Sequence, residues 1–231
     1  MTPHNFHQTR SHRIGLFGGT FNPIHLGHLQ VALDVRQQLE LDEVYFIPSS
    51  LPPHKGADQL AAARDRLEMV RLALGDRAGL APCGLELERE GPSYSIDTIR
   101  HIRRKLPDAQ KLYFMMGLDA FLEIHTWKAF RRLFEETAIA VMSRPGSGQW
   151  TARRDQEALS YVQRHIAPEY RLRRDDRMLV HPDKQCVYLL SVTPVDISSS
   201  SIRSGIRKGE PLDRWVAPPV ARYIQQKGLY R

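Results

Sequence analysis

The fold of this chain is constrained most by a short apolar run near its start. The run stops at two glycines, and a helical pattern follows. Residues 13–17 (RIGLF) are apolar, as in a buried strand, and the run ends at Gly18 and Gly19. After His25 the apolar residues recur at about the helical period, and residues 43–47 (EVYFI) form a second strand-like run. Strand, helix and strand in this order predict a βαβ unit and therefore a parallel sheet.

The same alternation continues through most of the 231 residues. We expect further strands at 85–88, 111–116, 137–142 and 187–192, and helices at 65–74, 94–106, 121–134 (broken near Thr126), 200–208 and 218–226. The pattern predicts an α/β fold: an open, doubly wound, Rossmann-like parallel sheet with helices on both faces. Ligands of such sheets bind beyond the carboxyl ends of the strands.

Residues 147–184 depart from this alternation. They are rich in arginine, aspartate and glutamine and contain helical pieces with little apolar periodicity. We interpret them as an insertion at the rim of the sheet, within a single domain formed by residues 13–231. The polar residues 1–12 are interpreted as a disordered tail. Neither segment is expected to contribute much to the core.

Charge and cysteine content narrow the class of protein. The net charge is +7, but much of the excess comes from arginines scattered on expected helix faces, which a solvated basic surface explains better than a nucleic-acid-binding patch. A positive field also suits a protein that binds small anionic nucleotides. The two cysteines form no CxxC pair, no apolar run approaches the roughly 18 residues needed to span a bilayer, and the first residues do not resemble a secretory signal. We therefore expect a cytoplasmic protein without membrane or nucleic-acid partners, and leave a homo-oligomer open.

The glycine-rich turn itself is suited to anion binding. Gly18, Gly19 and Thr20 lie between a strand and a helix, where backbone N–H groups and the helix dipole face a ligand. The spacing is not GxGxxG, so the dinucleotide-binding fingerprint is absent. The chain contains no Gly-Lys pair, so it has no P-loop.

His25 and His28 lie three residues apart and therefore share a helix face. Structural histidines that cap a loop are one explanation for this pair. A zinc pair is a second, but the chain lacks HExxH and a nearby cysteine. Phosphate binding is the explanation we favour, because both imidazoles can donate N–H bonds and Gly27 between them removes a side chain. A triphosphate would also favour their protonated forms.

Several segments together carry a family resemblance. Residues 18–28 (GGTFNPIHLGH) resemble the HxGH signature of the nucleotidyltransferase superfamily, and residues 197–203 (ISSSSIR) resemble its ISSTxIR box. Residues 117–119 (GLD), followed by Trp127, resemble its GxD…W segment. Residues 52–55 (PPHK) and 93–98 (SYSIDT) are similar to segments of the bacterial nicotinate-nucleotide adenylyltransferase family. The resemblance runs from about Ile14 to the C-terminus, apart from residues 147–184.

The resemblance implies adenylyl transfer from ATP to nicotinate mononucleotide, which gives nicotinate adenine dinucleotide and pyrophosphate in NAD biosynthesis. It implies Mg²⁺ bound with the ATP phosphates and no metal site of the protein's own. His25, His28 and Arg203 would be catalytic. The ATP-binding residues would be Gly18, Gly19, Thr20, Phe21, His25, His28, Gly117, Asp119, Ser199, Ser200, Ser201, Ile202 and Arg203. The residues that bind the other substrate would be Lys55, Tyr94, Thr98, Trp127 and Arg144.

Simpler interpretations stand beside several of these roles. Arg203 follows four serines, so it could be a surface arginine on a well-capped helix. Asp119 suits a ribose hydroxyl and a helix cap equally well. A lone Trp127 would pack in a core, and only the family resemblance favours stacking on a pyridine ring. Arg144 is either a substrate contact or a rim charge.

Two rival functions remain at this stage. Another adenylyltransferase of the same superfamily, such as one that acts on phosphopantetheine, is the nearer rival, although SYSIDT and Trp127 speak against it. A non-catalytic RNA-binding domain is the rival from a different class, because of the basic charge balance.

Overall fold

Eight strands form one sheet in this computed structural model, which describes residues 13–51, 60–89, 91–106, 111–143 and 150–231. The strands are β1 (Arg13–Gly19), β2 (Glu43–Pro48), β3 (Leu80–Pro82), β4 (Lys111–Gly117), β5 (Ala138–Met142), β6 (Arg171–Arg173), β7 (Met178–Val180) and β8 (Val187–Leu190). Their order across the sheet is β3-β2-β1-β4-β5-β8-β7-β6. The strands from β3 to β8 in this order pair in parallel, and β7 and β6 add an antiparallel edge.

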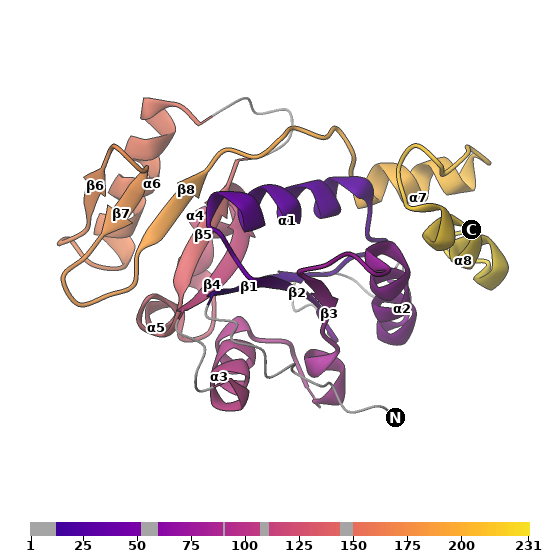
Figure 1. The fold of residues 1–231 in the computed structure, drawn as a ribbon, viewed down its shortest axis with the longest axis horizontal. Coiled ribbons are helices and arrows are strands. Elements are labelled where there is room, and N and C mark those ends of the chain that lie inside the picture. Colours follow the sequence, from indigo (N-terminus) through magenta and orange to yellow (C-terminus); the bar gives the residue numbers. More distant parts are fainter. Residues whose placement is uncertain (1–12, 52–59, 90, 107–110, 144–149) are drawn as a thin grey trace.

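Helices cover both faces of the sheet. In Figure 1, α1 crosses above the central strands and α3 lies below them. The α-helices of the described residues are α1 (Leu26–Gln38), α2 (Ala63–Leu74), α3 (Ser95–Lys105), α4 (Leu118–Leu122), α5 (Phe130–Glu136), α6 (Ala152–His165), α7 (Ser199–Arg207) and α8 (Pro218–Lys227), and their 3₁₀-helices are η2 (Leu85–Glu88) and η3 (Ile124–Thr126). The doubly wound α/β arrangement expected from the sequence is confirmed.

The central strands read as continuous apolar runs because they are buried on both faces. On β4, Leu112 and Phe114 join the core cluster that also holds residues of α3, α5 and α6. The intervening residues Tyr113 and Met115 join the opposite cluster, with residues of α1, α2 and α8. A period-2 alternation therefore divides one strand between two cores.

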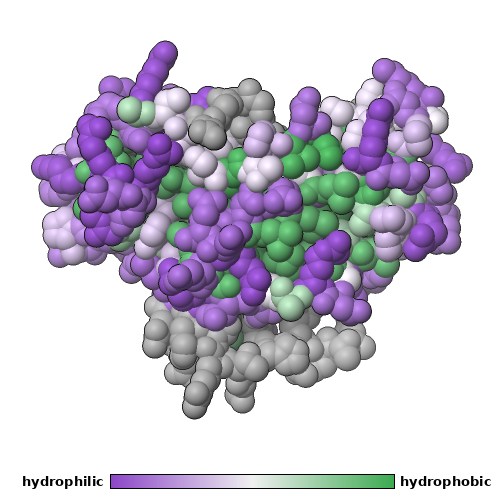
Figure 2. Space-filling model, turned by 45° about the horizontal axis from the view of Figure 1, so that its top comes forward, coloured by the Kyte–Doolittle hydropathy of each residue, from purple (hydrophilic) through white to green (hydrophobic). Residues whose placement is uncertain are grey.

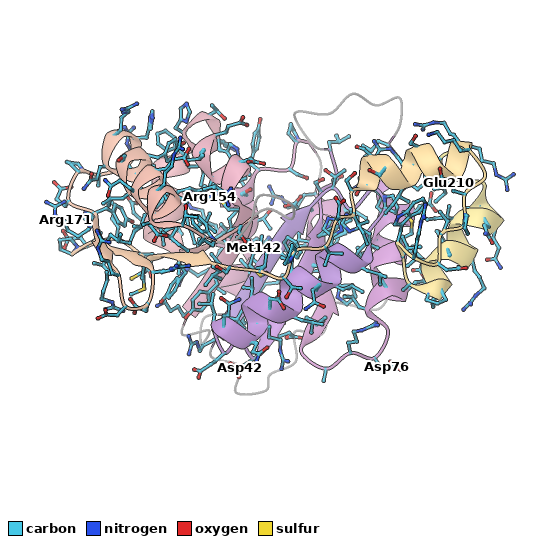
Figure 3. The ribbon with its side chains drawn as sticks, turned by 90° about the horizontal axis from the view of Figure 1, so that it is seen from above. Asp42, Asp76, Met142, Arg154, Arg171 and Glu210 are labelled. Atoms are coloured by element: carbon cyan, nitrogen blue, oxygen red, sulfur yellow. The ribbon has the colours of Figure 1, made fainter. Side chains whose placement is uncertain are left out.

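The strand order also fixes where a ligand can bind. From β1 the chain proceeds through β2 and β3 to one side, whereas β4, β5 and β8 lie on the other. The order therefore reverses between β1 and β4, whose carboxyl ends are Gly19 and Gly117. Asp42 and Asp76, which precede β2 and β3, mark the opposite, amino-terminal edge of the sheet in Figure 3. A crevice at such a reversal is the usual binding position in open α/β sheets.

The prediction of a strand at residues 85–88 is wrong. Residues 85–88 form the 3₁₀-helix η2, in which Leu85 and Glu86 are both buried. The strand that does form in this region is the short β3, which precedes η2 and pairs with β2. The sequence alone did not predict it. Its three residues are too few to produce a readable alternation, while the leucines of LELE imitate one.

The expectation that residues 147–184 contribute little to the core is also wrong. This segment forms α6, β6 and β7 and extends the sheet at its antiparallel edge. Trp150, Val162, Tyr170 and Leu179 are all at most 3% exposed and belong to one of the two main core clusters. On α6 the apolar stripe is narrow and flanked by charged residues, which concealed it in the sequence.

The face that carries α1 is apolar in its middle. Figure 2 shows hydrophobic residues gathered there between hydrophilic ends of the molecule. Leu33, on α1, is 38% exposed.

Within the described residues, every helix is too short or too polar to cross a bilayer.

Candidate active site

The loop after β1 is shaped by a close approach between Gly19 and an aromatic ring. Phe21 has a φ of +47° and is almost completely buried. A Cβ atom at Gly19 would lie 3.0 Å from the Phe21 ring, which is tighter than side chains normally tolerate. The Phe21 ring in turn lies edge-on to His28, with ring centroids 5.1 Å apart. The glycine-rich turn therefore has a packing role in addition to the anion-binding role expected for it.

His25 and His28 lie together at the N-terminus of α1. His25 is the N-cap residue, and its ring stacks on that of His28 with centroids 3.7 Å apart. The backbone N–H of His25 donates to Nδ1 of His28 over 3.3 Å. A Cβ at Gly27 would lie 3.1 Å from Nδ1 of His25, so Gly27 makes room for the histidine ring itself. The two histidines form one unit, as their spacing predicted.

Burial determines the protonation of His25. His25 is only 8% exposed, and burial lowers its pKa to about 4, so the ring is neutral at pH 7. Its Nδ1 atom is buried and has no hydrogen-bond partner among the described residues. Because Nδ1 of His28 accepts a hydrogen bond, a neutral His28 carries its proton on Nε2. Burial thus opposes the protonated imidazole that a nearby triphosphate would favour.

The N-terminus of α7 docks on the same loop, although it lies far away in the sequence. Ser198 caps α7 by accepting from the backbone N–H of Ser201. Ser199 donates its hydroxyl hydrogen to the Pro23 carbonyl over 2.9 Å. Arg203 donates from Nη1 to the Asn22 carbonyl, also over 2.9 Å. The fold therefore brings the serine-rich helix start to the loop that leads into the histidine pair.

Two details of α7 refine the expected ATP contacts. Nε of Arg203 is buried without a hydrogen-bond partner among the described residues, while Nη2 contacts the Ser200 hydroxyl at 3.4 Å. Ile202, expected among the ATP-binding residues, is completely buried in the core, and its N–H donates to the Ser198 carbonyl. The side chain of Ile202 is therefore a packing residue, and the predicted contact of Ile202 with ATP stays a prediction that concerns its backbone.

Gly117 and Asp119 lie where β4 ends, next to the carboxyl end of β1. Gly117 is the N-cap of α4, and Asp119 is an exposed residue in the first turn of that helix. The helix-cap explanation for Asp119 does not fit, because the cap position belongs to Gly117. A carboxylate at this edge of the sheet remains well placed for a hydroxyl group of a ligand.

A cavity of about 400 Å³ opens beside the glycine turn. It is lined by Gly18, Gly19, Thr20, Ile47, Ser49, Glu86, Ser93, Tyr94, Ser95, Phe114, Thr126, Trp127 and Lys128. Trp127 follows η3, packs edge-on against Phe114 and presents the rest of its half-buried ring to the cavity. The two interpretations of Trp127 are compatible, because one part of the ring packs on the core while another lines the cavity.

Thr98 does not line this cavity. It is 2% exposed, and its hydroxyl donates to Oε1 of Glu86 over 2.7 Å. Glu86, which does line the cavity, is therefore held in place by Thr98. The sequence missed Glu86 because the segment was interpreted as a strand. Lys55 and Arg144 lie outside the described residues.

Arg66 is a further residue that the sequence did not reveal. It lies on α2 and is completely buried. Its guanidinium donates to the carbonyl oxygens of Ala61, Thr20 and Ser50 at 2.9 to 3.0 Å. Arg66 thereby ties the loop after β1 to the loop after β2. An arginine within a helical pattern is normally a surface residue, so no sequence signal pointed to this role.

Comparisons with known proteins identify the family of this chain. The family model described as cytidylyltransferase-like matches residues 16–205. A probable nicotinate-nucleotide adenylyltransferase of Desulfatibacillum aliphaticivorans is 39% identical over 224 residues, which covers 94% of this chain and 99% of the relative. A relative of the same description from Geobacter metallireducens is 40% identical over 218 residues, with 94% and 98% covered.

Solved structures support the fold. The nicotinic acid mononucleotide adenylyltransferase of Plasmodium falciparum complexed with NaAD has a TM-score of 0.68 at 19% identity, covering 94% of this chain and 97% of its own. The same enzyme complexed with APC has a TM-score of 0.66. At this identity the likeness establishes the α/β architecture.

Proposed function

Because the chain belongs to the cytidylyltransferase-like family, among its nicotinate-nucleotide adenylyltransferases, we propose that it transfers the adenylyl group of ATP to nicotinate mononucleotide. The products are nicotinate adenine dinucleotide and pyrophosphate, a step of NAD biosynthesis. The observation that carries this proposal is the docking of two helix N-termini, those of α1 and α7, on one loop that borders the cavity. Helix N-termini are suited to phosphates, and the cavity is suited to the second nucleotide.

The chemistry requires little from the protein beyond alignment and charge. The attacking group is a phosphate oxygen of the mononucleotide, which is already ionised near neutral pH because the second pKa of a phosphomonoester is about 6. This oxygen forms a bond to the α-phosphorus of ATP, and the bond from that phosphorus to pyrophosphate breaks. No general base and no covalent intermediate are needed. The site must hold two polyanions in line and stabilise the charge that develops.

His25, His28 and Arg203 are proposed to supply that stabilisation. The histidine pair offers N–H donors at the start of α1, and the burial of His25 makes it a neutral donor whose hydrogen bonds act in a poorly solvated place. Arg203, which is bonded to the Asn22 carbonyl of the same loop, offers a permanent positive charge. Gly18, Gly19 and Thr20, which line the cavity, are proposed to add backbone N–H donors.

The cavity is proposed to bind nicotinate mononucleotide. Trp127 provides an aromatic face for the pyridine ring, and Tyr94 adds a second wall. The first turn of α3, which starts at Ser95, offers N–H donors to the carboxylate of that ring. Lys55 and Arg144 are proposed as contacts of the same nucleotide on the resemblance alone.

Mg²⁺ is proposed to arrive with ATP. Among the described residues there is no group of three or more His, Cys, Asp or Glu side chains that could hold a metal ion. This fits an ion that is held largely by phosphate oxygens and water, as is usual for Mg²⁺ in nucleotide sites. When bound, it would neutralise part of the triphosphate charge.

The test is a pyrophosphate-release assay with ATP and a series of acceptors. We expect release with nicotinate mononucleotide and formation of the dinucleotide in equal amount. Release with phosphopantetheine but not with a pyridine mononucleotide would overturn the proposal in favour of the related enzyme. Absence of any release, together with RNA binding, would favour the non-catalytic alternative. Light scattering of the same preparation tests the homo-oligomer that the sequence left open.

A further inference from the structure

Tyr230 follows α8 and reaches back to the loop after β1. Its hydroxyl lies 2.8 Å from Oδ1 of Asn22, which stands 208 residues earlier in the chain. Figure 1 shows the labelled C end of the chain beside α7 and α8. Tyr230 has a φ of +68°, a left-handed conformation that costs a non-glycine residue free energy and persists where surrounding contacts hold it. Its contact with Asn22 is one of those that determine where the residue lies.

The amide oxygen of Asn22 is the acceptor in this contact. The backbone N–H of Ala61 points at the same Oδ1 atom over 3.0 Å, and a backbone N–H can only donate. The oxygen therefore faces both partners, and Tyr230 is the second donor. Burial raises the pKa of Tyr230 against the opposing effect of Arg66 and Arg203, so the phenol keeps the proton that it donates.

Asn22 connects this bond to the residues proposed to be catalytic. It is 7% exposed, and its backbone carbonyl accepts from Nη1 of Arg203 over 2.9 Å. It also belongs to the short stretch that leads into His25, the N-cap of α1. Ala61 and Tyr230 thus hold the side chain of a residue whose carbonyl holds Arg203. A shift of Asn22 moves the anchor of that guanidinium.

We propose that Tyr230 is a positioning residue for adenylyl transfer, whose hydroxyl holds Asn22, and through it Arg203, in the geometry that the transition state requires. The inference rests on the proposed function and adds to it a residue that carries no motif. The described residues that line the cavity do not include Asn22, Arg203 or Tyr230. Loss of the hydroxyl should therefore leave binding of the mononucleotide intact and slow the reaction, because the reacting groups are less well aligned.

The experiment compares Tyr230→Phe with Tyr223→Phe, since each variant keeps the aromatic ring and removes one hydroxyl. Tyr223 is the matched control. It lies on α8 and is half-buried like Tyr230, but its hydroxyl donates over 2.7 Å to Oδ1 of Asp65, on α2 rather than on the loop.

We expect Tyr230→Phe to lower kcat about tenfold, because a misplacement of about 1 Å can cost about 100-fold and one lost hydrogen bond should shift the loop by less. KM for each substrate should stay within about twofold of the wild-type value. Tyr223→Phe should keep kcat within about twofold, while thermal melting should show a similar loss of stability for the two variants.

A double-mutant cycle tests whether Tyr230 acts through Asn22. In an Asn22→Ala background the acceptor oxygen is absent, so the addition of Tyr230→Phe should change kcat by less than about twofold. A kcat of Tyr230→Phe no lower than that of Tyr223→Phe overturns the inference alone. So does a loss from Tyr230→Phe that persists in full in the Asn22→Ala background. Failure of the wild type to release pyrophosphate with nicotinate mononucleotide overturns the proposed function and the inference with it.

Discussion

At the scale of single residues, burial holds His25 in its neutral state. The rings of His25 and His28 stack closely, and His25 is nearly inaccessible to solvent. A proton on both rings would place two cations in contact. The spacing of the two residues predicted a shared face, but it could not predict this burial, because Phe21, which packs against His28, adopts an unusual backbone conformation.

This burial predicts a pH dependence of stability. His25 takes up a proton near pH 6.5 in the unfolded chain, but only near pH 4 in the folded protein. Its contribution to stability is therefore complete above pH 6.5 and is lost as the pH falls towards 4. Between pH 7 and pH 5, the free energy of unfolding of the wild type should fall by about 2 kcal/mol more than that of His25→Gln. Urea denaturation at both pH values measures this, and parallel losses in the two proteins would refute it.

Loss of His28 should act on the transition state. His28→Ala removes one N–H donor beside the reacting phosphate, so kcat should fall by roughly 100-fold or more while KM for ATP changes less. Gln37→Ala, an exposed change in the last turn of the same helix, should leave both constants unchanged. Near-normal turnover by His28→Ala would remove His28 from the catalytic residues.

Loss of Trp127 should act on one substrate only. Trp127→Ala removes the stacking face of the cavity, so KM for nicotinate mononucleotide should rise roughly tenfold, with KM for ATP little changed. Steady-state kinetics with each substrate varied in turn provides the internal control. A selective rise in KM for ATP would assign Trp127 to the other pocket.

At the scale of elements, the sequence predicted those whose pattern is local. The helices at 65–74 and 218–226 and the strands at 43–47 and 111–116 agree with the structure within a few residues. The helix expected at 121–134 is interrupted as anticipated, by η3 and by Ala129, which has a left-handed φ of +51°. The element at 85–88 was wrong, and β3 was missed, because their conformations depend on packing against β2 rather than on their own residues.

The segment at 147–184 provides a stability test at this scale. Leu179 on β7 is completely buried, so Leu179→Ala should lower the free energy of unfolding by about 2–5 kcal/mol. Leu33→Ala, at an exposed position of α1, should change it by less than about 0.5 kcal/mol. Chemical denaturation of both variants checks the comparison. A cost for Leu179→Ala as small as that for Leu33→Ala would show that the segment is not part of the core.

At the scale of the whole molecule, the site exists only because distant segments meet. Hydrogen bonds join the loop at 20–23 to the helix start at 198–203 and to the buried Arg66. No local sequence pattern predicts these bonds. The motifs indicated which segments should be functional, and the reversal of strand order between β1 and β4 explains why they converge. The position of Glu86 in the site became visible only from the cavity that it lines.

Isotope labelling of the acceptor tests the central claim most directly. Nicotinate mononucleotide with ¹⁸O at its terminal phosphate oxygens is incubated with ATP and the protein. The masses of both products are then measured by mass spectrometry. Direct attack by the mononucleotide phosphate on the α-phosphorus of ATP predicts a dinucleotide that retains every labelled oxygen and a pyrophosphate that contains none. Loss of label from the dinucleotide, or an adenylylated protein in the absence of the acceptor, would contradict the account.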